Sequence, residues 1–198
     1  MIQYTNPVWT ALIAAVVLGE WIGRAQVGLA LLSLAGVVLV ARPGFLTGGG
    51  SALDPVAVAV ALVGALFSAG AYVTVRRLRG EEPMVVVFHF ALVSTLGSLP
   101  ALAFAPVLPR GSEWLLLLAI GVATHLGQVF LTLGLQREPA GRAMTVGYLQ
   151  IVFAALWGAV LFGELPDGWA VLGGAVIVAC TLRLSRVPAL RPPPPKAP

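Results

Sequence analysis

Two segments of this sequence, residues 4–20 and 148–164, are near copies that align without a gap. Eight of the seventeen aligned positions are identical, including the first and the last residue of each copy. Each copy is an apolar run that ends in Gly-Glu, and a further apolar run follows at once. An apolar unit repeated at this distance predicts a membrane protein built from two related halves, the arrangement typical of secondary transporters.

The composition leaves too few polar residues to coat a soluble globule. Hydrophobic residues make up 59% of the chain and charged residues 10%, whereas a soluble domain carries about 25% charged residues. The bilayer is therefore the expected surrounding of this chain. The net charge is +4, but the basic residues lie in short gaps between apolar runs, so no nucleic acid is expected as a partner. A single cysteine, Cys180, excludes an internal disulfide.

Seven segments are apolar over about 17 residues or more, the lower limit for a membrane-spanning helix. We therefore expect an all-α, polytopic helical membrane protein with about seven transmembrane helices and no loop that could hold a soluble domain. The expected spans are residues 4–20, 25–41, 54–76, 83–104, 113–135, 140–162 and 168–184.

The basic residues predict the orientation of these spans. Ten of the twelve fall on one side, and only Arg42 and Arg110 fall on the other. The side rich in basic residues is normally cytoplasmic, so the N-terminus is expected outside and the C-terminus inside. The two copies then run in opposite directions and form a partial inverted repeat, which lets one site face either side of a membrane. The ten residues are Arg24, Arg76, Arg77, Arg79, Arg137, Arg142, Arg183, Arg186, Arg191 and Lys196.

The repeated helix carries further marks. It ends in Gly-Glu, has Pro7 early in the first copy, and precedes an apolar helix with glycines, Gly28 and Gly36 in one case and Gly173 and Gly174 in the other. These features resemble the EamA-like domain of the drug/metabolite transporter superfamily. The resemblance implies a multi-pass protein of the cell (inner) membrane that moves small metabolites or amphipathic compounds by alternating access. Neither ATP nor a cofactor is implied.

The resemblance also implies a division of the chain. Residues 54–184 resemble one complete five-helix unit, and residues 1–43 resemble the last two helices of a preceding unit. Residues 185–198 are expected to form a disordered cytoplasmic tail rich in Pro and Arg. Because family members have ten helices, the resemblance covers the last seven. The alternative to a transporter is a truncated or non-transporting membrane protein that needs a partner chain for the other three helices. A homo-oligomer is the other assembly considered.

Polar side chains inside a span are costly, so each is a candidate for the wall of a cavity. His125, Gln128 and Thr132 lie at i, i+3 and i+7, on one face of the fifth span. Their alternative role is hydrogen bonding between packed helices. Tyr72 in the third span and, at the start of the sixth, Tyr148 and Gln150 complete the expected substrate-binding set, with an anchor at the membrane interface as the alternative for Tyr148.

An enzyme is not expected. The sequence contains no Gly-x-Ser-x-Gly or His-Glu-x-x-His motif and no carboxylate pair within a span, so neither a catalytic residue nor a metal site is predicted. Glu20 and Glu164 close the repeated helices. A carboxylate is unfavourable at a helix C-terminus, so we expect a structural partner for it, such as Arg24 or the start of the next helix for Glu20.

The orientation can be tested by labelling. A cysteine at Leu78, in a variant that lacks Cys180, should react with a membrane-impermeant maleimide only from the cytoplasmic side, because three arginines surround that position. A cysteine at Ser112, in the loop that holds Arg110, is the matched control and should react only from outside. Labelling of position 78 from outside would overturn the orientation.

Overall fold

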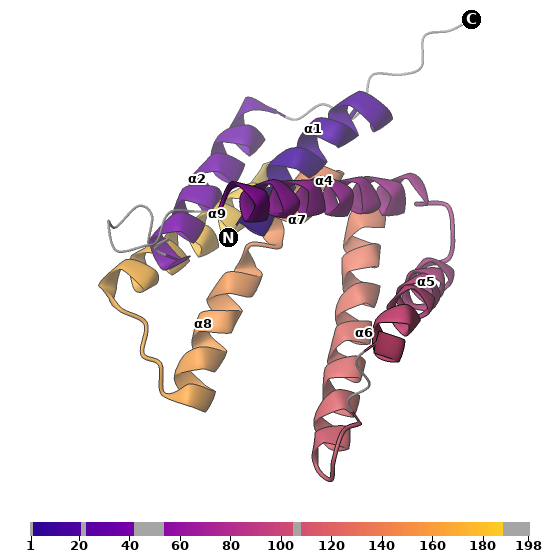
Figure 1. Ribbon diagram of the computed structural model, residues 1–198. Helices are drawn as coiled ribbons and strands as arrows, with labels where there is room; N and C mark the ends of the chain where they lie inside the picture. The colour runs from indigo at the N-terminus through magenta and orange to yellow at the C-terminus, as the bar shows by residue number, and fades with distance from the viewer. Residues whose placement is uncertain (1, 21–22, 42–53, 105–107, 188–198) are drawn as a thin grey trace, which may run out of the picture. The chain divides into compact units, whose positions relative to one another are not determined.

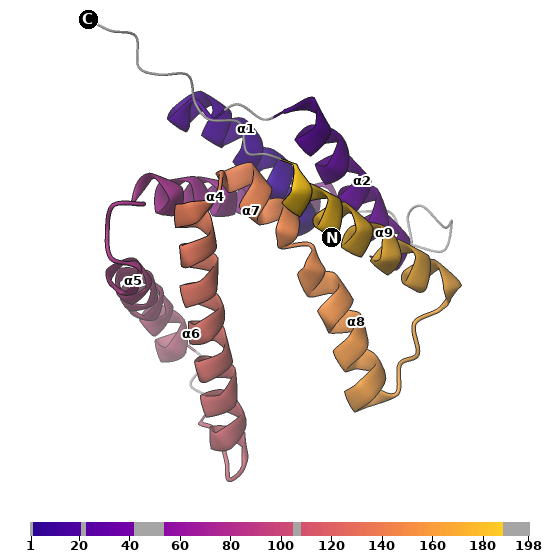
Figure 2. The ribbon, with the colours of Figure 1, turned by 180° about the vertical axis from the view of Figure 1, so that it is seen from behind.

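The computed structural model describes residues 2–20, 23–41, 54–104 and 108–187. Within these ranges the chain forms helices and no strands, as Figures 1 and 2 show from opposite sides. The expected connector around residues 42–53 and residues 188–198 of the expected tail lie outside the described residues. The elements are η1 (Ile2–Thr5, a 3₁₀ turn), α1 (Asn6–Leu18), α2 (Arg24–Ala41), α4 (Pro55–Arg77), α5 (Pro83–Phe104), α6 (Glu113–Arg137), α7 (Ala140–Val146), α8 (Leu149–Phe162) and α9 (Gly168–Arg186).

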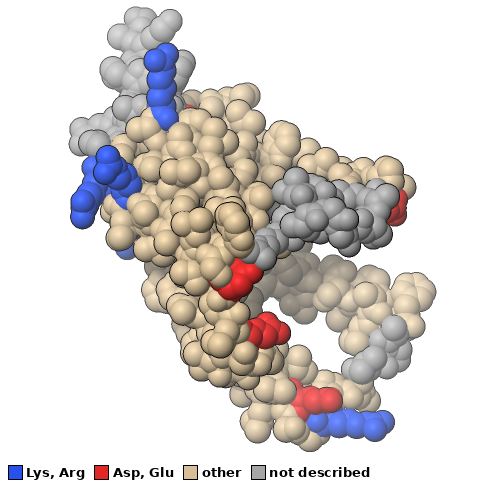
Figure 3. Space-filling model, turned by 90° about the vertical axis from the view of Figure 1, so that its left-hand side faces the viewer, with Lys and Arg blue, Asp and Glu red and all other residues tan. Residues whose placement is uncertain are grey.

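Six spans in the described part of the chain are long and apolar enough to cross a membrane. They are α2, α4, α5, α6, α9 and the pair α7–α8 taken together. The all-α, multi-pass fold class expected from the sequence is confirmed. Large apolar side chains also face outward, for example Val16 at 86% exposure and Phe104 at 90%. Charged residues are few on the face drawn in Figure 3.

The first expected span, residues 4–20, is shorter than the sequence suggested. Its α-helix, α1, has 13 residues and follows the 3₁₀ turn η1. At 1.5 Å per residue it reaches only about 20 Å, against the ~30 Å of a bilayer core. The α-helix begins next to Pro7 and stops at Gly19, so both limits are set by residues that favour helix ends.

The two sequence copies end their helices in the same way. Gly19 and Gly163 both adopt the left-handed conformation, with φ of 63° and 69°, which glycine adopts without steric cost. The N–H groups of Gly19 and Glu20 both donate to the carbonyl of Ala14, and those of Gly163 and Glu164 both donate to that of Gly158. The repeat is therefore structural at these ends as well as in sequence.

The sixth expected span, residues 140–162, is interrupted between α7 and α8, a bend that Figure 2 shows. Here the N–H of Tyr148 donates to the carbonyl of Thr145 at 3.2 Å, and the N–H of Gln150 to that of Gly147 at 3.1 Å. These are i→i−3 bonds, so the backbone tightens for about one turn. The first copy has its 3₁₀ turn at the matching place, η1, which holds Tyr4. The sequence predicted neither turn.

The chain divides into two compact units. Unit 1 contains residues 1–74 and 138–198, and unit 2 contains residues 75–137. In unit 2, α5 packs against α6, and the side chain of Arg76 links the end of α4 to the end of α6. Arg76 Nη1 donates to the carbonyls of Leu135 at 3.2 Å and Gln136 at 2.7 Å. A guanidinium at the C-terminus of α6 complements the helix dipole and its last carbonyls.

Unit 1 is centred on the packing of α2 against α9, the most extensive helix–helix contact among the described elements. Gly36 and Gly173 lie backbone to backbone. A Cβ on Gly36 would be 2.8 Å from the carbonyl oxygen of Gly173, and a Cβ on Gly173 would be 2.5 Å from that of Gly36. Farther along, Gln26 near the start of α2 and Leu184 near the end of α9 line one pocket. The two helices therefore run antiparallel, as an inverted repeat requires.

A hydrophobic cluster lies beside this crossing. It consists of Val37 from α2, Tyr148 and Ile151 at the start of α8, and Ile177 from α9, all buried. The glycine contact lets α2 and α9 approach closely, which brings Val37 and Ile177 near each other. The buried apolar side chains of α2, α8 and α9 thus pack together next to the α2–α9 contact.

The close approach predicts a position-specific effect of alanine. Gly36→Ala should lower the free energy of unfolding by about 1–3 kcal/mol, because its methyl group meets backbone that has little room to move. Gly28→Ala, on the same helix, would meet no atom within 4 Å and should be neutral or slightly stabilising. Thermal unfolding in detergent would compare the two variants, and equal stability would contradict the close packing.

Candidate functional site

The predicted polar stripe lies on α6 in unit 2. Exposure falls along it: His125 is exposed, Gln128 is half-buried and Thr132 is buried. Among the residues that the structure describes, none forms a hydrogen bond with the His125 ring or the Gln128 amide. Hydrogen bonding between packed helices, the alternative role for this stripe, is therefore not observed for these two side chains.

The other predicted site residues belong to unit 1. Tyr72 is half-buried on α4, and Gln150 is exposed at the start of α8. Tyr148 lies two positions before Gln150, at the bend between α7 and α8, and it is buried whereas Gln150 is exposed. The α6 stripe and this group are in different compact units, and the common site expected for all six residues stays a prediction.

Tyr148 has a clear structural role in unit 1. Its ring is 1% exposed and belongs to the hydrophobic cluster around Ile177. Its hydroxyl donates to the main-chain carbonyl of Tyr4 at 2.8 Å, a contact between equivalent positions of the two copies. Such burial does not fit an anchor at the membrane interface, which would leave the ring at the lipid boundary. Tyr148 instead joins the starts of the two repeats.

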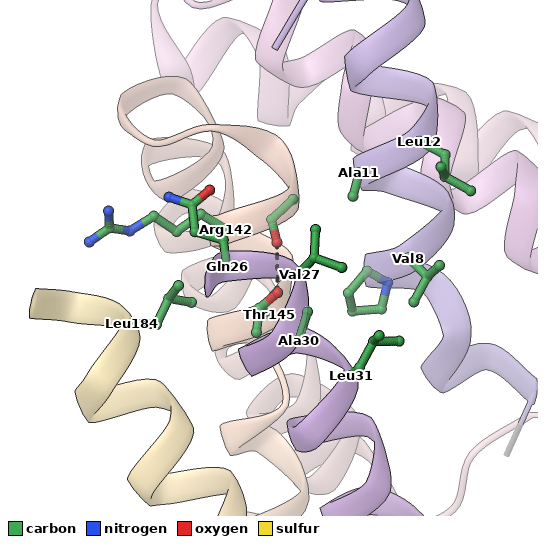
Figure 4. A pocket seen from close by; sticks show the side chains of 12 residues that line it. Val8, Ala11, Leu12, Gln26, Val27, Ala30, Leu31, Arg142, Thr145 and Leu184 are labelled. Atoms are coloured by element: carbon green, nitrogen blue, oxygen red, sulfur yellow. Dashed lines mark hydrogen bonds between the residues drawn. The ribbon is translucent and has the colours of Figure 1, made fainter. Parts of the chain in front are cut away.

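Unit 1 also contains a pocket of about 110 Å³ that the sequence did not suggest. Figure 4 shows side chains of α1 on one side of it and side chains of α2 on the other, with α7 and α9 nearby. The lining residues are Pro7, Val8, Ala11, Leu12, Gln26, Val27, Ala30, Leu31, Gly141, Arg142, Thr145 and Leu184. Sequence reasoning selected polar residues within spans and so missed a cavity made mainly by small and apolar ones.

The polar groups at the edge of this pocket are already engaged. Arg142 donates to the carbonyls of Val187 at 2.7 Å and Ser185 at 3.3 Å, and its Nε lies 3.4 Å from the carboxylate of Glu138. The hydroxyl of Thr145 donates to the carbonyl of Gly141 at 2.8 Å, the dashed line in Figure 4. The pocket therefore offers an apolar surface rather than free hydrogen-bonding groups.

Glu20 has a partner that differs from the expected ones. Its Oε2 accepts a hydrogen bond of 2.9 Å from the N–H of Ala140, the first residue of α7. We had expected Arg24 or the start of the following helix as the partner. A helix N-terminus does compensate the carboxylate, because it carries free N–H groups and partial positive charge, but that helix comes 120 positions later in the chain.

No metal centre is indicated in the described part of the chain. Within those residues, no three His, Cys, Asp or Glu side chains gather in a way that could hold a metal ion. The single cysteine, Cys180, is buried on α9.

A conservative substitution separates the structural role of Tyr148 from a role in binding. Tyr148→Phe removes one hydrogen bond and leaves the ring in place, so it should lower the free energy of unfolding by about 1 kcal/mol. Thermal unfolding in detergent would measure this. Unchanged stability would show that the bond to Tyr4 contributes little, and a loss of solute binding much larger than the loss of stability would add a direct contact with the solute.

Comparison with known proteins gives consistent matches. Residues 55–186 match the EamA-like transporter family. The chain is 37% identical over 188 residues to the pseudopaline exporter CntI of Pseudomonas aeruginosa, covering 94% of this chain and 64% of that protein. It is 28% identical over 183 residues to a riboflavin transporter of Rhizobium johnstonii, covering 92% of this chain and 59% of that protein.

A solved crystal structure has the same fold. It superposes with a TM-score of 0.80 at 25% sequence identity and covers 93% of this chain and 65% of the other. The chain therefore spans less than two thirds of the length of the curated relatives and of the solved structure described above.

Proposed function

Because this chain belongs to the EamA-like transporter family, we propose that it works in a secondary transporter that moves small metabolites or amphipathic compounds by alternating access. The observation that carries the proposal is the family match over residues 55–186. Relatives named as transporters support it and fit a role other than catalysis. An inverted repeat with antiparallel α2 and α9 suits alternation between two faces of a membrane.

The cargo is proposed only as a chemical class. One relative is named for pseudopaline and another for riboflavin, so related proteins serve more than one solute. Both solutes are organic small molecules. Pseudopaline is the first probe to try, because its exporter has the higher identity to this chain.

As solute-binding residues we propose the polar residues that the sequence singled out. They are His125, Gln128 and Thr132 in unit 2 and, taken separately, Tyr72, Tyr148 and Gln150 in unit 1. The free polar atoms of His125 and Gln128 support this assignment for the α6 stripe. A polar side chain within a membrane span that has no hydrogen-bonding partner in the protein is a candidate for a solute contact.

Residues 1–198 are proposed to form part of a complete transporter. The chain covers 64% of the pseudopaline exporter, so a second copy or a partner chain is proposed as the source of further helices. We also propose the cell (inner) membrane as the location, with the C-terminus in the cytoplasm. The ten basic residues on one side of the spans support that orientation.

Transport can be tested in liposomes that contain the protein at its native length. The wild type should move labelled pseudopaline, or another small molecule in a metabolite panel, faster than empty liposomes do. Gln128→Ala should slow uptake by about three- to tenfold, because one hydrogen bond to the solute is lost. Phe130→Leu is the matched control on α6, since Phe130 is 70% exposed and lies on another side of the helix.

Two outcomes would count against these assignments. Equal rates for Gln128→Ala and the wild type would remove the α6 stripe from the site. No uptake of any panel member above empty liposomes would contradict the transport proposal itself.

A further inference from the structure

The two sequence copies differ in the contacts of the glutamate that ends each of them. In the first copy, Glu20 is bonded to the N–H of Ala140. Its counterpart Glu164 is exposed, and its carboxylate has no hydrogen bond or ion pair with any residue that the structure describes. Both glutamates follow a left-handed glycine that ends an equivalent helix. Each copy therefore ends in a glutamate carboxylate that can accept a hydrogen bond, and within the described chain only the carboxylate of the first copy accepts one from a helix N-terminus.

The helix faces beside these glutamates differ in the same way. On α1, Asn6, Thr10 and Ala14 recur every four residues and are buried at 5%, 0% and 1% exposure. This helix packs against α7. The stripe is narrow and made of one amide followed by two small side chains, which lets α7 come close.

Within the described residues, most of the equivalent stripe on α8 is exposed. Its residues are Gln150, Ala154 and Gly158, again one amide followed by two small residues at the same spacing. Gln150 and Ala154 are exposed and Gly158 is half-buried. At its end, Glu164 Oε2 lies 3.7 Å from the position a Cβ on Gly158 would take. The stripe and the free carboxylate thus form one continuous surface.

We propose that this surface, the Glu164 face, docks the start of a membrane helix of the same kind as α7. The helix would come from a polypeptide segment outside residues 1–198, in the part of the longer relatives that this chain does not match. Its first N–H groups would bind the Glu164 carboxylate, and its small first residues would lie on Ala154 and Gly158. In α7 those first residues are Ala140 and Gly141, both buried.

The charges and the packing of α7 support this occupant. A carboxylate at the C-terminus of its own helix is unfavourable, and the N-terminus of a second helix relieves it. The structure contains that solution at Glu20. The α7 of a second copy is not this occupant, because it is already bonded to its own Glu20 and packed against its own α1.

A synthetic copy of residues 138–162 serves as the probe, since it contains α7 and is long enough to span a bilayer. The peptide would carry a fluorescent acceptor at its C-terminus. The full chain would carry a donor on a cysteine at Val160, which is exposed, in a Cys180→Ala background. Energy transfer in lipid nanodiscs would give the dissociation constant.

The proposal predicts saturable binding that depends on the Glu164 face. Glu164→Gln should raise the dissociation constant about tenfold, because a charge-assisted hydrogen bond is lost, and Ala154→Leu should raise it at least as much by blocking close approach. The controls are Glu82→Gln, an exposed acid in unit 2, and Ala179→Leu, an exposed alanine on α9. Both controls should bind like the wild type.

Stability provides a second, independent readout. Glu20→Gln should lower the unfolding temperature of the chain alone, whereas Glu164→Gln should leave it unchanged, because only Glu20 has its partner within the described chain. Absence of binding, or equal binding by Glu164→Gln, Ala154→Leu and the controls, would overturn the proposal. Self-association of the chain alone that disappears in Glu164→Gln would overturn it as well, because it would assign the face to a second copy.

Discussion

The backbone contact between Gly36 and Gly173 is the constraint on which the rest of unit 1 depends. In a bilayer the hydrophobic effect does not press helices together, so association relies on van der Waals contact and on hydrogen bonds between close backbones. Two glycines at one crossing permit that closeness for α2 and α9. The cluster around Tyr148 and Ile177, the tyrosine bond between the two copies and the apolar pocket all lie beside this pair.

Much of the fold can be predicted from the lengths of the apolar segments and from the prolines and glycines that end the helices. Length and hydropathy predicted six spans that the structure contains, because these properties are local and the bilayer imposes a minimum length. The short α1 and the bend before α8 were not predicted. Both depend on a few backbone hydrogen bonds near Tyr4 and Tyr148, and average hydropathy carries no information about such bonds.

The candidate site shows where sequence reasoning stops. A polar stripe on α6 can be located from spacing alone, because helix geometry fixes which residues share a face. Which other residues these side chains contact depends on the tertiary structure and cannot be read from the spacing. For Tyr148 the sequence suggested a ligand contact or an interfacial anchor. The structure shows a buried ring and a hydroxyl that donates to the carbonyl of Tyr4, and the contact with a ligand stays a prediction. The hydrogen bond between Ala140 and Glu20 was not predicted either. The two residues lie 120 positions apart, and nothing in the sequence around Ala140 marks it as a donor to Glu20.

The order in which partners emerge from the ribosome has a consequence for biogenesis. Helices α1 and α2 are synthesised before α7 and α9, against which they pack. Until α7 and α9 have been synthesised, Glu20 lacks its bond to Ala140, and the glycine surface of α2 lacks its contact with α9. During that interval the nascent protein exposes to lipid the surface of α2 that α9 later covers. That interval is when an insertase or a quality-control protease would meet it.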